Sequence, residues 1–235
     1  MIDISFMLPT ARATEHPDVL KSCIEGINRE HSGLNHEILV YSRERVEGEN
    51  VKWIEEEGQK GPIYGFNLLA SEFAQGDYLV VITDDHLFVN SVSLCIDNIE
   101  NTFTNRKYKI GGLLPEGDTC CLPQKGQRMG TPPGIMEVDI PRIPFLRFPV
   151  VRKDTFKLLG GYIFHPDLFY HAGDMWLGYY LYMNGEPTIE GPTRITPIKQ
   201  LKNSDYEGSD CDIVHELIKR HVAGQTEYVS GRARK

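Results

Sequence analysis

The feature that most constrains the fold is an apolar run that ends abruptly in two acids. Residues 78–83 are rich in β-branched and aromatic side chains and follow a Gly-Asp pair, which predicts a strand buried on both faces. Asp84 and Asp85 come directly after it. Two adjacent acids cannot both be buried without partners, because an isolated charge in a protein interior is costly. Taken alone, the stretch fits either a divalent cation held by carboxylates or a turn or helix cap, which Asp often forms.

Strand and helix patterns alternate through the first half of the chain. Apolar runs at residues 4–8, 37–41 and 51–54 predict strands, and helical spacing near residues 17–27 and 61–75 predicts helices between them. Such alternation implies an α/β fold with a mostly parallel sheet and right-handed crossovers. In an open α/β sheet ligands bind at the carboxyl ends of the strands, where the acid pair is expected to lie.

The second half is less regular. A helix is expected at residues 92–102, and residues 117–141 form a long Gly- and Pro-rich stretch that predicts a functional or mobile loop. Further elements are predicted at 145–152 (strand), 153–159, 174–184 and 212–222 (helices).

Composition restricts the classes of partner. The chain has 33 acids and 25 bases, a net charge of −8, which argues against non-specific binding to nucleic acid or to an anionic membrane surface. The five cysteines are an odd number and indicate free thiols in a reducing compartment. Adjacent Cys120 and Cys121 lack a second pair at zinc-finger spacing. We find no signal peptide and no apolar run long enough for a membrane span, so we expect a soluble, cytoplasmic protein.

Four sequence pieces occur in a fixed order. They are Pro9-Thr10 after the first strand, Asn67 on the helix beginning near Gly61, the Thr-Asp-Asp-His stretch at 83–86, and Gly-Gly-Tyr at 160–162 ahead of Asp174. This order resembles glycosyltransferase family 2, and the resemblance extends from about residue 4 to residue 185. It implies the GT-A fold, an open, mostly parallel twisted sheet flanked by helices.

The resemblance also implies roles for individual residues. Asp85 would be the direct ligand of Mn²⁺ or Mg²⁺ bridging the two phosphates of a nucleotide-diphosphate sugar, and Asp84 would lie by the ribose or a metal-bound water. Asp174 would be the catalytic base that deprotonates the acceptor hydroxyl during single displacement with inversion. The remaining substrate-binding positions are Pro9, Thr10, Arg12, Ser42 and Asn67. The acceptor would be a sugar, a lipid-linked molecule or another hydroxyl compound.

The chain departs from the family pattern at two places. Ser42 stands at the end of the second strand, where the family usually carries an acid that contacts the base, and this weakens the case for uracil. Gly173 precedes Asp174 where the family usually has Glu. Candidates for a further metal ligand are His86, His215 and His221, for which a surface, turn or packing role is the competing interpretation.

The resemblance predicts one domain over residues 1–235. A donor nucleotide-binding half would span about 1–90 and an acceptor-side half about 111–224, with 225–235 a disordered tail. Two rival functions stay open. A nucleotidyltransferase is disfavoured because residues 8–12 contain no glycine for gripping a triphosphate. A glycosyltransferase-like domain that has lost catalysis and binds a partner would explain the altered motifs.

Overall fold

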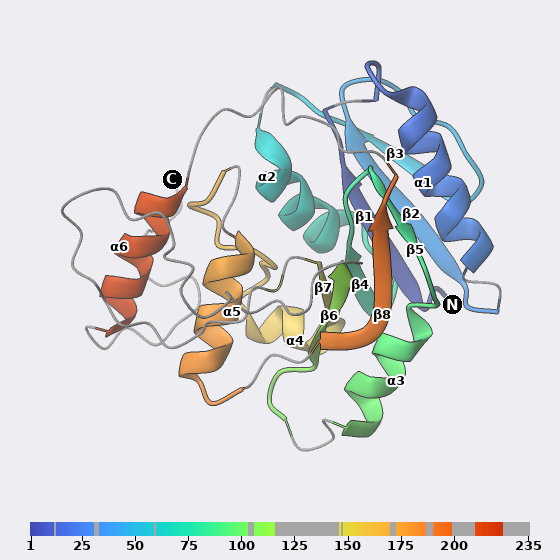
Figure 1. The fold of residues 1–235 in the computed structure, drawn as a ribbon. Coiled ribbons are helices and arrows are strands. Elements are labelled where there is room, and N and C mark those ends of the chain that lie inside the picture. Colours follow the sequence, from blue (N-terminus) through green and yellow to red (C-terminus); the bar gives the residue numbers. More distant parts are fainter. Residues whose placement is uncertain are drawn as a thin grey trace.

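A computed structural model of the chain shows a single mixed β-sheet with helices on both faces (Figure 1). The structure describes residues 1–11, 13–30, 33–58, 60–102, 106–115, 146, 148–169, 173–186, 190–198 and 210–222. The sheet has eight strands in the order β3-β2-β1-β4-β7-β6-β8-β5. The predicted α/β architecture is confirmed.

Four parallel strands from the first half of the chain form one side of the sheet. They are β1 (Ile4–Pro9), β2 (His36–Ser42), β3 (Val51–Glu55) and β4 (Tyr78–Val81). Strand β1 pairs with both β2 and β4, and β3 lies outside β2. Every residue of β1 is buried, as expected for a strand covered on both faces. All four strands were predicted from their apolar runs.

The other side of the sheet is formed by the four strands that follow β4 in the chain. Strand β7 (Pro149–Arg152) runs antiparallel to β4, and β6 (Ile110–Pro115) runs antiparallel to β7. Strand β8 (Glu190–Pro197) pairs parallel with β6 and antiparallel with β5 (His86–Phe88). The strands β5, β6 and β8 were not predicted. The antiparallel pairs β4–β7, β6–β7 and β5–β8 make the sheet mixed.

Helices cover both faces of the sheet. They are α1 (Pro17–Glu30), α2 (Gly61–Leu68), α3 (Ser93–Thr102), α4 (Lys153–Leu158), α5 (Gly173–Met183) and α6 (Cys211–Val222). Helix α2 continues into a π-helical turn, η1 (Leu69–Phe73), within the range where one helix was predicted. Within the described ranges no helix is long and apolar enough to span a bilayer.

Two hydrophobic clusters, one on each face, hold the helices to the sheet. Side chains such as Phe66 of α2, Trp176 of α5 and Leu217 of α6 belong to one cluster. Ile24 of α1 and Ile99 of α3 belong to the other. Burial of each such side chain contributes roughly 1.5–3 kcal/mol relative to exposure, so these clusters supply most of the driving force for folding. Figure 1 shows α1 and α3 together on one side of the sheet and α2, α4 and α5 on the other.

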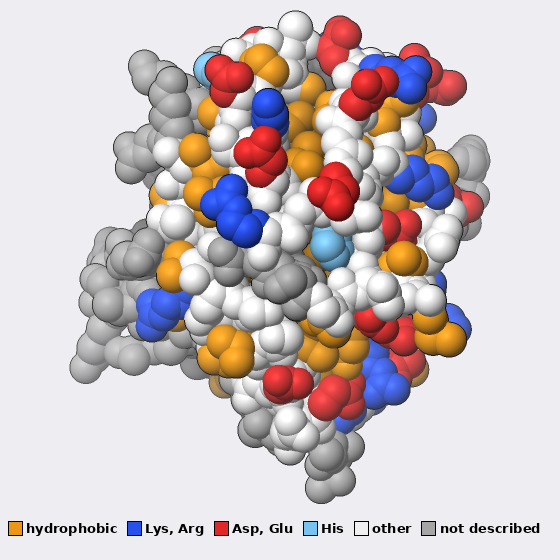
Figure 2. Space-filling view, turned by 90° about the vertical axis from the view of Figure 1, so that its right-hand side faces the viewer, with side chains coloured by type: hydrophobic (Ala, Val, Ile, Leu, Met, Phe, Trp, Pro, Cys, Tyr) orange, Lys and Arg blue, Asp and Glu red, His pale blue; other side chains and the backbone are white. Residues whose placement is uncertain are grey.

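The surface over α1 carries charges of both signs. Figure 2 shows this face, where the described Lys, Arg, Asp and Glu side chains are interspersed with hydrophobic ones and form no large area of a single sign. A polyanion would bind best to a continuous basic surface. The described residues of this face form no such surface.

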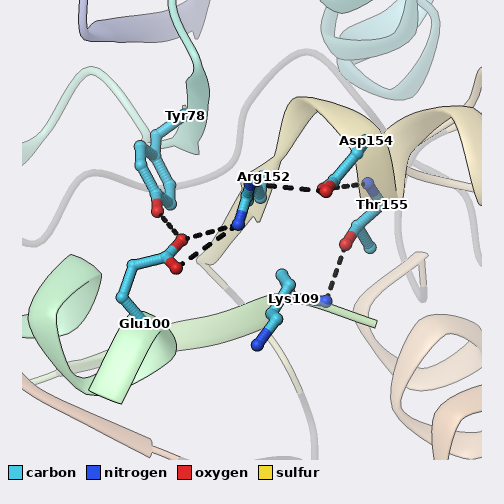
Figure 3. A network of polar contacts seen from close by, with 6 residues as sticks. All are labelled: Tyr78, Glu100, Lys109, Arg152, Asp154 and Thr155. Carbon is cyan, nitrogen blue, oxygen red and sulfur yellow. Dashed lines mark hydrogen bonds and ion pairs between the residues drawn. The ribbon is translucent and has the colours of Figure 1, made fainter. Parts of the chain in front are cut away.

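A polar network ties the amino end of β4 to α3 and β7 (Figure 3). The Tyr78 hydroxyl donates to the Glu100 carboxylate, which also accepts hydrogen bonds from Nη1 of Arg152 at 3.1 and 3.3 Å. Burial, followed by the hydrogen bond to Glu100, raises the pKa of Tyr78 well above its usual range, so the phenol stays protonated as a donor. Tyr78 and Arg152 face each other in the β4–β7 register. This network lies at the opposite end of β4 from Asp84 and Asp85.

Candidate active site

A row of buried polar side chains follows the carboxyl ends of the four parallel strands. Thr10 follows β1, Ser42 ends β2, Glu56 follows β3 and Asp84 lies beyond β4. All four residues are buried. Because parallel strands end at the same edge, this row marks the side of the sheet at which an α/β fold binds its ligands. Three of the four were predicted site residues; Glu56 was not.

Thr10 and Asp84 lie in direct contact at the centre of this row. The hydroxyl of Thr10 donates to Oδ2 of Asp84, and the Thr10 amide donates to the carbonyl of Tyr41 at 2.9 Å. The neighbouring Pro9 ends β1 opposite Tyr41 and packs close to Gly65 of α2. The structure thus brings together residues 9, 10 and 84, which the resemblance had placed around a nucleotide.

Cys23 of α1 is buried next to the acid pair. Its thiol lies 3.7 Å from the carbonyl oxygen of Thr83. Burial, and then the nearby charge of Asp84, raise the pKa of this thiol well above its ordinary value. Because a soft metal binds the thiolate, a protonated Cys23 is a poor metal ligand.

Asp85 is oriented by the residues on either side of it. Its Oδ1 accepts a hydrogen bond from the Thr83 hydroxyl at 2.8 Å and lies 2.8 Å from Nδ1 of His86. Its backbone carbonyl accepts the amide of Ile198 at 2.7 Å, just beyond β8. The His86 ring also packs on Phe148, with 4.9 Å between ring centroids. His86 therefore orients Asp85 through Nδ1.

The acids after β4 fit a hard divalent cation whose coordination shell would be completed by substrate. Within the described ranges, no three His, Cys, Asp or Glu side chains gather in a cage that could hold a metal ion by themselves. Mg²⁺ is typically held by one or two carboxylates together with substrate phosphates and water, so Asp85 with a neighbouring Asp84 is a suitable partial site. The side chains of His215 and His221 lie outside the described part of the structure, as does all of Arg12. The roles predicted for these three residues stay predictions.

Asn67 joins α2 to the segment that precedes α5. Its side-chain carbonyl accepts the amides of Ile163 at 2.9 Å and Phe164 at 3.0 Å, and Nδ2 donates to the Phe164 carbonyl at 2.8 Å. Asn67 also lines a cavity of about 350 Å³ between α2 and residues 162–169. Asn67 therefore fixes the path of the chain that leads toward Asp174. Its contact with substrate stays a prediction.

Asp174 lies in the first turn of α5. Its Oδ1 accepts the amide of Met175 at 2.9 Å, and its backbone carbonyl accepts the amide of Leu146 at 3.4 Å. A carboxylate in the first helical turn is stabilised in its charged form by the aligned backbone dipoles. Asp174 is half-buried, which leaves the predicted base partly accessible.

Gly173, the residue before the predicted base, is closely surrounded by other side chains. A Cβ atom at position 173 would lie 2.6 Å from Cδ1 of Phe164 and 2.9 Å from Cδ1 of Ile63. Both side chains are buried in the core. A side chain at position 173 would therefore require Phe164 or Ile63 to move, and Phe164 belongs to the segment that Asn67 binds.

We expect Gly173→Ala to destabilise the protein by about 1–2 kcal/mol, because overpacking outweighs the better helix propensity of alanine. Urea denaturation of the two proteins measures the difference. The variant Gly173→Ala with Phe164→Leu is the matched control, and we expect it to recover part of the loss. A gain in stability for Gly173→Ala alone would contradict the steric explanation.

The remaining predicted position, Ser42, uses its hydroxyl within the protein. Its Oγ donates to the carbonyl of Glu44 at 2.7 Å and accepts from the indole Nε1 of Trp53 at 3.2 Å. Its backbone carbonyl accepts the Glu56 amide at 3.0 Å. Ser42 keeps its expected place at the edge of the sheet, and its contact with substrate stays a prediction.

Comparison with known proteins connects the fold to glycosyltransferases. No family model matches the sequence, and no curated protein matches it. Solved structures match over most of the chain. The TarS fragment 1–349 from S. aureus in complex with UDP-GlcNAc is 14% identical, with a TM-score of 0.57, covering 95% of this chain and 67% of that one.

Two further structures contain Mn²⁺. GalNAc-T7 with UDP, GalNAc and Mn²⁺ is 12% identical with a TM-score of 0.63, over 89% of this chain and 45% of that one. The mannosyltransferase PcManGT from Pyrobaculum calidifontis with GDP-Man and Mn²⁺ is 13% identical with a TM-score of 0.57, over 94% and 70% of the two chains. The chain therefore has the GT-A fold of these glycosyltransferases, and the predicted resemblance is confirmed at the level of fold.

Proposed function

We propose that the protein is an inverting, metal-dependent glycosyltransferase that moves a sugar from a nucleotide-diphosphate donor to an acceptor hydroxyl. The observation that carries the proposal is the acid pair at the carboxyl end of β4, with Asp84 bonded to Thr10 and Asp85 oriented by His86, on a GT-A fold. Similar folds bind UDP-GlcNAc in TarS and GDP-Man with Mn²⁺ in PcManGT.

The donor would bind along the row of polar residues at the carboxyl edge. Pro9 and Thr10 would line the nucleotide pocket, with Asp84 near the ribose and Asp85 holding the cation. Mn²⁺ or Mg²⁺ would supply positive charge to the leaving diphosphate. The diphosphate would then leave without being protonated by an acid. The reaction would need one titratable side chain, the base that accepts the proton of the acceptor hydroxyl.

Asp174 would accept the proton of the acceptor hydroxyl. As the oxygen of that hydroxyl forms its bond to the anomeric carbon, the bond from this carbon to the diphosphate oxygen breaks, and the configuration inverts. The carboxylate needs to be ionised near neutral pH, which its place in the first turn of α5 favours. Asn67 would position this base through the segment it binds.

A thermal-shift screen tests the proposal directly. We expect a panel of UDP-, GDP-, ADP- and TDP-sugars to raise the melting temperature in the presence of Mn²⁺ and to do so much less with EDTA, because a ligand that binds only the native state stabilises it. Donors that bind are then assayed for hydrolysis or transfer. Binding without any turnover would favour the catalytically inactive binding domain, and no stabilisation by any donor would count against both functions.

A further inference from the structure

A cavity of about 350 Å³ follows one face of α2, between that helix and residues 162–169. We call it the α2 groove. On the helix its lining residues form a single stripe, namely Lys60, Ile63, Tyr64, Asn67, Leu68 and Ser71. This stripe extends along about three helical turns. A groove of this volume and length is narrow, so it suits one extended chain better than a pyranose ring.

Contacts along the α2 groove hold its two walls together. Asn67 binds the backbone of residues 163–164. The amide of Phe169 donates at 2.8 Å to Oδ2 of Asp210, which is buried directly before α6. Gly61 has a φ of +79°, and a Cβ atom there would lie 2.6 Å from the carbonyl oxygen of Phe169. The groove therefore exists before any ligand binds, which lowers the entropic cost of binding.

The polar side chains of the stripe are engaged within the protein. The Asn67 amide binds the backbone of the opposite wall, and Oγ of Ser71 donates to the carbonyl of Leu68 at 3.3 Å. The hydroxyl of Tyr64 accepts a hydrogen bond from Nζ of Lys60 at 3.4 Å. A sugar in the groove would leave hydroxyl groups without partners, which is costly, whereas a hydrocarbon chain gains free energy by leaving water.

Positive charge lies at the end of the α2 groove that is nearest the carboxyl edge of the sheet. Among the described residues that line the groove, only Lys60 is charged. Its amide donates to Oε1 of Glu56, the residue that follows β3, and its Nζ lies 4.7 Å from the centre of the Tyr64 ring. This end of the groove is therefore complementary to an anionic group, and the apolar remainder is complementary to a hydrocarbon chain.

We propose that the acceptor is a single-chain lipid, with its hydrocarbon chain in the α2 groove and an anionic, hydroxyl-bearing head beside Lys60. This inference rests on the proposed function, since it names the acceptor of that reaction. The groove adjoins the start of α5, because Cδ1 of Ile63 would lie 2.9 Å from a Cβ atom at Gly173, next to Asp174. In the transfer step the lipid oxygen bonds to the anomeric carbon, its proton passes to Asp174, and the nucleoside diphosphate leaves.

Calorimetric titration with lauroyl lysophosphatidylglycerol, below its critical micelle concentration and without donor, tests the occupant. We expect this lipid to bind at least about a hundredfold more tightly than glycerol 3-phosphate, which has the charge but no chain. Lys60→Gln removes the cation, and we expect it to weaken lipid binding about tenfold. Lys52→Gln is the matched control, since Lys52 also lies over an aromatic ring, that of Phe73, but does not line the groove. We expect this control to bind the lipid as the wild-type protein does.

Ser71→Phe tests the groove itself. Ser71 is exposed at the far end of the stripe, so a ring there would fill the groove without disturbing the core. We expect the affinity for the lipid to fall at least about tenfold. Glu72→Phe adds the same ring at the next residue, which is exposed and does not line the groove, and we expect it to keep wild-type affinity.

Equal affinity for the lipid and for glycerol 3-phosphate overturns the inference, as does unchanged lipid binding by Ser71→Phe. Transfer is then assayed with the nucleotide sugars that stabilise the protein in the thermal-shift screen. A lipid that binds but receives no sugar overturns its role as acceptor. Because the titration contains no donor, its result is read independently, and failure of every nucleotide sugar to bind would refute the proposed function instead.

Discussion

Replacing Asp85 by alanine is expected to weaken Mn²⁺-dependent binding of nucleoside diphosphate by about a hundredfold or more. Asp85 is the acid at the end of β4 that His86 and Thr83 orient, and its backbone is anchored by Ile198. Removing its carboxylate would leave only Asp84 of the acid pair to bind the cation, and Asp84 already accepts a hydrogen bond from Thr10. Titration of the diphosphate with and without Mn²⁺ measures the change.

Asp77→Ala is the matched control for this variant. Asp77 is exposed and directly precedes β4, at the end opposite to Asp85, so the substitution removes the same charge without touching the acid pair. We expect its Mn²⁺-dependent affinity to match that of the wild-type protein. If Asp85→Ala binds nucleotide with unchanged metal dependence, Asp85 is not the ligand and the donor site lies elsewhere.

Asp174→Asn is expected to lower turnover by about a thousandfold while leaving donor affinity unchanged. A general base contributes roughly 10²- to 10⁴-fold, and an amide cannot take the proton of the acceptor hydroxyl. The substitution preserves an oxygen that can accept the Met175 amide, so the start of α5 should be retained. Single-turnover transfer, measured together with donor titration, separates loss of chemistry from loss of binding.

The exposed Asp97 of α3 offers a control for the change of charge. Asp97→Asn removes one negative charge on the other face of the sheet, and we expect wild-type turnover. Normal transfer by Asp174→Asn would show that another group accepts the proton. Loss of donor binding by the same variant would instead place Asp174 on the nucleotide side of the reaction.

The first half of the fold could be predicted because its signals are local. The runs that form β1, β2 and β4 are apolar enough to be recognised as buried strands, and the acids follow the last of them directly. The edge of the sheet where Thr10 and Asp84 meet then follows from the parallel arrangement alone. The overall order of motifs supplied the GT-A expectation.

The elements that escaped prediction lack such signals. Strand β5 has three residues, β6 contains two adjacent glycines, and β8 contains two prolines and a glycine, which argue against a strand in sequence terms. These strands form through pairing with distant segments. Helix α2 continues into a π-helical turn that the spacing of apolar residues does not indicate.

The burial of Glu56 at the carboxyl edge of the sheet was not predicted, for a related reason. In the sequence it lies within a run of three glutamates, and such a run is typical of a solvated surface. Only the register of β3 determines which of the three turns inward, and that register is set by pairing with β2. Strict alternation of side chains along β3 could have singled out the residue, since Ile54 and Glu56 share a face.

The pairing of β5 with β8 has a consequence for biosynthesis. The amide that anchors Asp85 belongs to Ile198, so a nascent chain carries its acid pair long before the partner segment leaves the ribosome. Contacts between such distant segments form slowly, because the intervening chain must first lose conformational entropy. The parallel strands are therefore expected to assemble early, with the cation-binding end of β4 maturing among the last parts of the molecule.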